Sequence, residues 1–182
     1  IYTIDANGNV YVLNRKGEVR EKIKNRLNNL ASNVYLVGDK VEGGKLSALG
    51  KSGYVMSLLL KDQKDSLQPY SQTPRFMTVQ GKTTLIGSKN EVYKRSEGGN
   101  FDIELDEEIL LEPRMYQVAG ATYYAVSTAE DQIWIFDAEG KEMPGMPLYG
   151  NGLATVGVTS GKELHVIVAT KEGAVIDYKL GE

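Results

Sequence analysis

One ten-residue segment of this chain occurs twice: Pro74-Arg75-Phe76-Met77-Thr78-Val79-Gln80-Gly81-Lys82-Thr83 and, 39 residues later, Pro113-Arg114-Met115-Tyr116-Gln117-Val118-Ala119-Gly120-Ala121-Thr122. Pro, Arg, Val, Gly and the final Thr stand at the same places in both copies. Each copy continues through an apolar run, a polar turn and a second apolar run. The pattern therefore predicts an internal repeat of short strands joined by turns.

The same strand pattern recurs along the whole chain. Its anchors are spaced by 36, 46, 41 and 42 residues, and they are Val10, Leu46, Val92, Ile133 and Val175. A period near 41 residues, built from four short strands, is typical of a β-propeller blade. The 20 glycines fit this pattern, because tight hairpin turns need residues with positive φ. We predict an all-β chain: a β-propeller, or a fragment of one, with about five four-stranded repeats.

The expected repeats form a single domain, residues 1–182, with approximate bounds 1–24, 25–72, 73–112, 113–152 and 153–182. The first repeat lacks an inner strand and the last lacks an outer strand, so both ends are partial. A propeller ring closes to remove its sheet edges. Either the chain is part of a larger ring, or its two ends complete one blade between them. Because the sequence starts directly in a strand pattern without Met, we expect it to be a piece of a longer protein.

Short runs rich in Val, Ile, Tyr and Thr define the expected strands. In chain order they are 1–5, 10–14, 19–23, 33–37, 45–49, 54–60, 75–79, 83–87, 91–95, 101–105, 114–118, 122–126, 132–137, 143–149, 154–158, 164–169 and 174–180. One segment has a second interpretation. Val19, Ile23, Leu27 and Leu30 follow helical spacing, so residues 18–31 are either a short helix or contain an outer strand.

Composition excludes several classes of protein. The chain has no Cys, which removes disulfide scaffolds, thiol catalysis and Cys-ligated metals, and its single His removes multi-His metal sites. With 21 Lys and Arg against 24 Asp and Glu, the net charge of −3 argues against nucleic-acid binding. No run approaches 18 apolar residues, so we expect no transmembrane helix and no signal peptide within the given residues.

Two segments resemble blades of the quinoprotein-like (PQQ-like) β-propeller superfamily: Ile133-Trp134-Ile135-Phe136-Asp137-Ala138-Glu139-Gly140-Lys141-Glu142-Met143-Pro144-Gly145-Met146-Pro147-Leu148-Tyr149-Gly150 and Val166-Ile167-Val168-Ala169-Thr170-Lys171-Glu172-Gly173-Ala174-Val175-Ile176-Asp177-Tyr178. Blades of that superfamily read as two apolar strands, Asp-x-x-Gly and an outer strand. Its enzymes carry docking tryptophans in most blades, whereas this chain has only Trp134, on a different strand. The resemblance therefore implies the non-enzymatic branch, similar to bacterial envelope propellers, without a quinone cofactor.

Arg75 and Arg114 are the candidate ligand-binding residues. They stand at equivalent positions at the start of inner strands, which line the central channel of a propeller. Two guanidinium groups at one channel mouth would suit a carboxylate or a phosphate. The alternative is a structural salt bridge, repeated in each blade, to acidic residues of the preceding turn such as Glu112.

Other polar groups have simpler interpretations. His165 alternates with apolar neighbours and has no nucleophile beside it in sequence, so we interpret it as a solvent-facing or hydrogen-bonded strand residue. The segment 5–9 begins like a calcium loop, but position 12 counted from Asp5 is Lys16 instead of Glu, so a hairpin turn is expected there. The acidic run 102–112 predicts an outer strand with one exposed face, and the basic run 15–26 a solvated face.

We therefore predict a non-catalytic interaction or scaffold module without cofactor or metal. It would belong to a periplasmic, extracellular or other cell-envelope protein and bind a protein or glycan partner through its loop faces. One alternative is a propeller-type enzyme, a glycan lyase or hydrolase with carboxylates at the channel mouth. The other is a small-anion sensor that uses Arg75 and Arg114.

Overall fold

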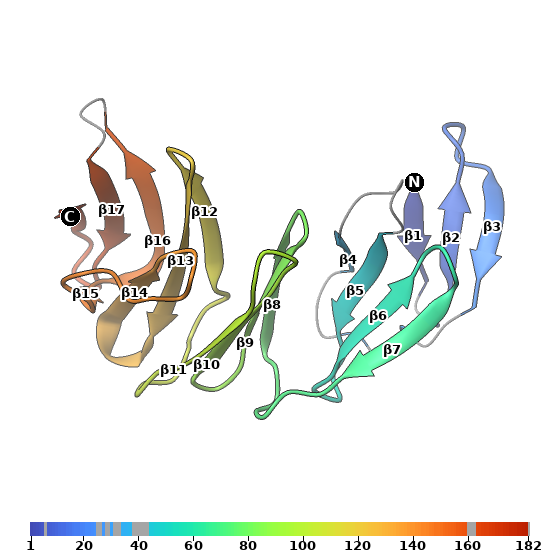
Figure 1. The fold of residues 1–182 in the computed structure, drawn as a ribbon, viewed down its shortest axis with the longest axis horizontal. Coiled ribbons are helices and arrows are strands. Elements are labelled where there is room, and N and C mark those ends of the chain that lie inside the picture. The colour runs from blue at the N-terminus through green and yellow to red at the C-terminus, as the bar shows by residue number, and fades with distance from the viewer. Residues whose placement is uncertain are drawn as a thin grey trace. The chain divides into compact units, whose positions relative to one another are not determined.

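The computed structural model describes residues 1–5, 7–24, 27, 30, 34–37, 44–159 and 163–181. In these residues the chain folds into antiparallel sheets in which sequence neighbours pair (Figure 1). Three sheets have four strands each, and the first and last sheets have three. The all-β class and the four-stranded sheets are thus confirmed. A closed ring of blades stays a prediction.

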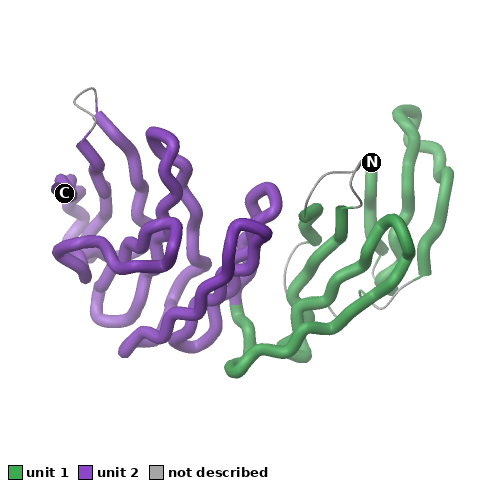
Figure 2. The backbone as a smooth tube through the Cα atoms, viewed as in Figure 1, with its two compact units in different colours: residues 1–75 green, residues 76–182 purple. Residues whose placement is uncertain are grey.

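The chain divides into two compact units, residues 1–75 and 76–182 (Figure 2). The first unit holds two sheets. Their strands are β1 (Tyr2–Ile4), β2 (Val10–Leu13) and β3 (Val19–Ile23), then β4 (Tyr35–Val37), β5 (Lys45–Leu49), β6 (Val55–Leu59) and β7 (Lys64–Gln68). Buried side chains from both sheets form one core, with Val10 and Ile23 on one side and Leu46, Met56 and Leu58 on the other.

The second unit holds three sheets. Their strands are β8 (Phe76–Gln80), β9 (Thr83–Gly87), β10 (Glu91–Arg95) and β11 (Phe101–Glu104), then β12 (Arg114–Val118), β13 (Ala121–Thr128), β14 (Gln132–Phe136) and β15 (Leu148–Tyr149), then β16 (Asn151–Val158), β17 (Leu164–Ala169) and β18 (Val175–Leu180). A short 3-10 turn, Ala129–Asp131, joins β13 to β14.

Alternation along the strands of the second unit directs apolar side chains to two separate cores. Leu85 and Val92 of one sheet pack with Val126 of the next. On the opposite face of that second sheet, Ile133 packs with Val166 of the last sheet. The middle sheet is therefore apolar on both faces, as expected for a layer covered on both sides.

The structure decides one alternative that the sequence left open and contradicts one expectation. Residues 19–23 form strand β3, paired to β2, so the helix interpretation fails there; residues 25, 26, 28, 29 and 31 of that segment lie outside the described part of the chain. In the second sheet, the expected outer strand 54–60 is the third strand, and β7 is the fourth. The sequence missed β7 because all five of its residues are exposed, so backbone pairing to β6 forms it without an apolar alternation.

A five-residue turn recurs at four places, beginning at Asp5, Asn14, Asp137 and Thr170. A side-chain oxygen at its first position accepts the backbone N–H groups of the third and fifth residues: Asp137 Oδ1 accepts from Glu139 at 3.0 Å and from Lys141 at 2.8 Å. Asp5 and Asn14 do the same in the first unit. The fourth residue is always Gly with φ between 76° and 85°, as the left-handed conformation requires: Gly8, Gly17, Gly140 and Gly173.

The turn glycines differ in the space around them, which gives a matched stability test. We expect Gly173→Ala to lower the free energy of unfolding by about 1–2 kcal/mol, because only the left-handed φ of 82° opposes the new Cβ. Gly140→Ala should cost about 1–3 kcal/mol more, because its Cβ would lie 2.7 Å from the ring of Phe101. Urea unfolding of both variants checks this, and equal losses would contradict it.

Acid should weaken the first turn. Hydrogen bonds from the side chain and backbone of Asn9 lower the pKa of Asp5 from 3.8 to about 2. The carboxylate thus stabilises the folded state above its unfolded pKa, and this contribution disappears as the pH falls from about 4 to 2. Asp5→Asn keeps an oxygen acceptor but cannot titrate. We expect its unfolding free energy to depend less on pH in this window than that of the wild type, by denaturant titration at each pH. Identical pH profiles would refute this role for Asp5.

Candidate functional site

The second unit carries a hollow of about 330 Å³, which we call the turn-face hollow. Its walls come from the β8–β9, β10–β11 and β12–β13 hairpin ends and from the residue that follows Asp137. The lining residues are Gln80, Lys82, Thr83, Lys94, Ser96, Glu97, Gly98, Met115, Gln117, Thr122, Tyr124 and Ala138. Most are amides, hydroxyls or charged groups. The volume is within the range of small-ligand sites.

Lys94 lies at the wall of this hollow and is only 8% exposed. Its ammonium donates a hydrogen bond of 2.8 Å to the backbone oxygen of Ala138, in the next sheet. It also lies over two aromatic rings, 5.4 Å from the centroid of Phe101 and 5.7 Å from that of Tyr124. The carbonyl oxygen and the two ring faces attract a cation, but none of them carries a formal negative charge. Lys94 forms no ion pair with any of the described residues.

The turn 137–141 brings Ala138 to this place. Asp137 fixes the turn by accepting two backbone N–H groups, and Gly140 lets the turn lie against the ring of Phe101. Burial raises the pKa of the Tyr124 phenol, with a smaller contribution from the Glu139 carboxylate, so Tyr124 stays neutral beside Lys94. At the edge of the hollow, Lys82 and Glu97 form an ion pair of 3.0 Å.

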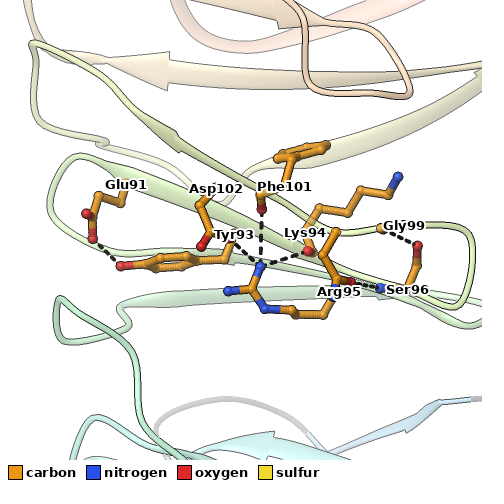
Figure 3. A network of polar contacts seen from close by, with 9 residues as sticks. Glu91, Tyr93, Lys94, Arg95, Ser96, Gly99, Phe101 and Asp102 are labelled. Carbon is orange, nitrogen blue, oxygen red and sulfur yellow. Dashed lines mark hydrogen bonds and ion pairs between the residues drawn. The ribbon is translucent and has the colours of Figure 1, made fainter.

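Arg95, the next residue along β10, points to the opposite face of the sheet (Figure 3). Its Nη1 donates to the backbone oxygens of Lys94 at 2.9 Å and of Phe101 at 3.2 Å, and it forms an ion pair with Asp102. The guanidinium also lies 5.4 Å from the centroid of the Tyr93 ring. Arg95 therefore ties β10 to β11 on this face, while Lys94 reaches the neighbouring sheet on the other.

A second polar junction joins the last two sheets. The Asp131 carboxylate accepts from Lys171 at 2.8 Å and from Asn151 at 2.7 Å, and these bonds lower its pKa. Glu130 and Asp131 both have φ near 60°, an uncommon conformation for residues other than glycine. The backbone oxygen of Asp131 also accepts from Gly150, so the strained turn is held on two sides.

The two arginines predicted as ligands do not lie in the hollow. Arg75 is exposed and directly precedes β8, as the last residue of the first unit. Arg114 is exposed and is the first residue of β12, in the second unit. Their equivalent places at inner strands agree with the repeat, but their convergence on one ligand stays a prediction.

The other polar groups lie where the sequence suggested. His165 Nδ1 is 2.8 Å from Asp177 Oδ1 on the paired strand, so it is a hydrogen-bonded strand residue, as predicted. Along β11 exposed and half-buried residues alternate, which confirms an outer strand with one wet face. Residues 15, 16, 20, 22 and 24 of the basic run are exposed, while residue 26 lies outside the described part of the chain.

Some classes of site have no support in the described residues. No group of three or more His, Cys, Asp or Glu side chains there is placed to hold a metal ion. No helix found there has the length and apolar character needed to cross a membrane.

Sequence reasoning missed Lys94, Asp131 and Lys171. Within the strand Glu91–Arg95, only the alternation of side chains between the two faces of the sheet distinguishes Lys94 from Arg95. The residue that accepts a hydrogen bond from Lys94, Ala138, lies 44 residues away in the sequence. Asp131 directly precedes the strand Gln132–Phe136, in a polar turn where carboxylates are common. The Thr-x-x-Gly turn that holds Lys171 is the one local signal for its position.

Removing both predicted ligands tests their role. We expect Arg75→Ala with Arg114→Ala to change the free energy of unfolding by less than about 0.5 kcal/mol, because both side chains are exposed. The same double variant should lose any binding of inorganic phosphate that the wild type shows by calorimetry. Unfolding of the double variant would instead support the structural salt bridge.

Comparison with known proteins supports the fold. No family model and no curated protein matches this sequence. Among solved structures, the chain is similar to BBS1N in the crystal structure of BBS1N in complex with ARL6DN soaked with mercury, with a TM-score of 0.64 and 16% identity. The match to the same complex soaked with lead has a TM-score of 0.61 and 16% identity. BBS1N is a β-propeller, so this likeness supports the propeller architecture.

These matches cover 96% of this chain but only 59% and 55% of the BBS1N chains. The chain therefore spans less than two thirds of the length of the propellers it matches. The resemblance to quinoprotein-like blades finds no specific support among these neighbours and stays a prediction.

Proposed function

We propose that this chain is part of a β-propeller that binds a protein partner through its turn faces. The observation that carries the proposal is the likeness in fold to BBS1N, a propeller crystallised in complex with a protein, ARL6DN. Rigid antiparallel sheets suit this role, because they hold the hairpin turns in fixed positions while leaving the turn side chains exposed.

We place the contact with the protein partner at the turn face around the hollow and not at the opposite end of the same sheet. Three hairpin ends and the turn 137–141 meet there, and they present hydroxyl, amide and charged groups beside a recess. Protein interfaces commonly combine a recess that takes an anchor residue with a polar rim. The opposite end of the same sheet presents the β9–β10 turn, with Lys89 exposed.

Two features of the proposal rest on sequence alone. The placement in a cell-envelope or secreted protein comes from the resemblance of the blades to envelope propellers. A glycan in place of a protein partner, or a small anion at Arg75 and Arg114, is an alternative that the same exposed turns permit.

Site-specific crosslinking on the full-length protein tests the function. A photo-crosslinking residue replaces Lys82, on the hollow face, or Lys89, at the other end of the same sheet. We expect Lys82 replacement to give a discrete protein adduct and Lys89 replacement to give none. The purified partner should then bind the wild-type protein saturably in solution.

Each alternative outcome has a definite meaning. An adduct only from position 89 would refute the choice of face. Failure of both positions, together with saturable binding of an oligosaccharide, would replace the protein partner by a glycan.

A further inference from the structure

Lys94 is a buried cation without a carboxylate partner among the described residues. Burying an ammonium is costly unless an anion or several acceptors replace its lost water. Here one backbone oxygen, that of Ala138, accepts one of its three N–H groups, and two aromatic faces supply weaker attraction. The remaining donors have no acceptor in the described residues.

The turn-face hollow lies beside this cation. Lys94 is one of its lining residues, and hydroxyl and amide side chains complete the wall: Gln80, Thr83, Ser96, Gln117 and Thr122. Such groups can donate to or accept from a bound polar ligand. The hollow thus combines a buried positive charge with several neutral hydrogen-bonding groups, which is the usual composition of a small polar binding site.

The charges set the class of ligand. Lys82 and Glu97 neutralise each other at 3.0 Å, so the net charge of the lining residues is that of Lys94 alone, +1. A single carboxylate matches one positive charge. A phosphate dianion would leave one charge unpaired and would lie near the Glu97 carboxylate, which disfavours it.

We propose that the turn-face hollow binds a carboxylate, held by an ion pair to Lys94 Nζ and by hydrogen bonds to the surrounding hydroxyl and amide groups. The carboxylate has two possible sources, a free organic acid or an acidic side chain of a bound protein. The second source rests on the proposed function, whereas the first is independent of it.

Methyl NMR of the full-length protein with ¹³C-labelled methionine tests the site. Met115 lines the hollow, and Met77, which is buried and does not line it, is the internal reference. The probes are butyrate, which carries a single carboxylate, the blocked peptide acetyl-Gly-Glu-Gly-amide, its Gln counterpart and inorganic phosphate. We expect a saturable shift of the Met115 signal with butyrate, with the Glu peptide or with both, and none with the Gln peptide.

Two variants assign the binding to Lys94. Lys94→Met keeps the apolar stem and removes the charge, and we expect affinity to fall by at least about 20-fold. Lys89→Met makes the same change at the other end of the sheet, and affinity should stay within about threefold. A second variant leaves Lys94 in place: Gln117→Trp fills the hollow from an exposed strand position and should also abolish the shift.

The outcomes separate the proposals. Butyrate binding without any protein partner supports the carboxylate site while the proposed function fails. No saturable Met115 shift with either carboxylate, phosphate binding as tight as butyrate binding, or unchanged affinity in Lys94→Met or Gln117→Trp overturns the site.

Discussion

In the turns that begin at Asp5, Asn14 and Asp137, two backbone N–H groups donate hydrogen bonds to one side-chain oxygen, and these bonds hold the adjoining strands in register. Where the turn has this form, the oxygen sits at its first position and a left-handed glycine at its fourth, as in Asp137 and Gly140. A slip of one residue in a strand pair would move every apolar side chain to the wrong face. Where it occurs, the turn therefore helps to decide which strand residues face the core.

The same turn also shapes the space between sheets. Because Gly140 has no side chain, the turn 137–141 lies against Phe101 and presents the Ala138 oxygen to Lys94. The hollow beside Lys94 is thus lined by residues of two neighbouring sheets, β8–β11 and β12–β15, and by Ala138 of the turn. A scaffold contact and a candidate ligand contact share one lysine, so stability and binding are coupled at this point.

The sequence predicted most strands because burial and turn chemistry agree there: 45–49, 83–87, 91–95, 114–118 and 164–169 have the expected bounds. It missed the strand Lys64–Gln68, because all five residues are exposed and the strand is defined by its backbone pairing to β6. It placed the candidate site at Arg75 and Arg114 because repeated positions are visible in a sequence. Lys94 was not visible, since its burial depends on a turn 44 residues away, and contacts between sheets leave no local pattern.

The five-residue turn has two fixed positions, the first and the fourth, and the residues at its other three positions vary. The middle residues differ in every copy: Ala6-Asn7, Arg15-Lys16, Ala138-Glu139 and Lys171-Glu172. In the turn 137–141 the backbone oxygen of Ala138 accepts a hydrogen bond from Lys94. In the turn 170–174 the side chain of Lys171 forms an ion pair with Asp131. A repeat protein of this kind can thus diversify its surface one turn at a time, with new contacts arising at free positions while the glycine and the oxygen-bearing residue keep the strands in place.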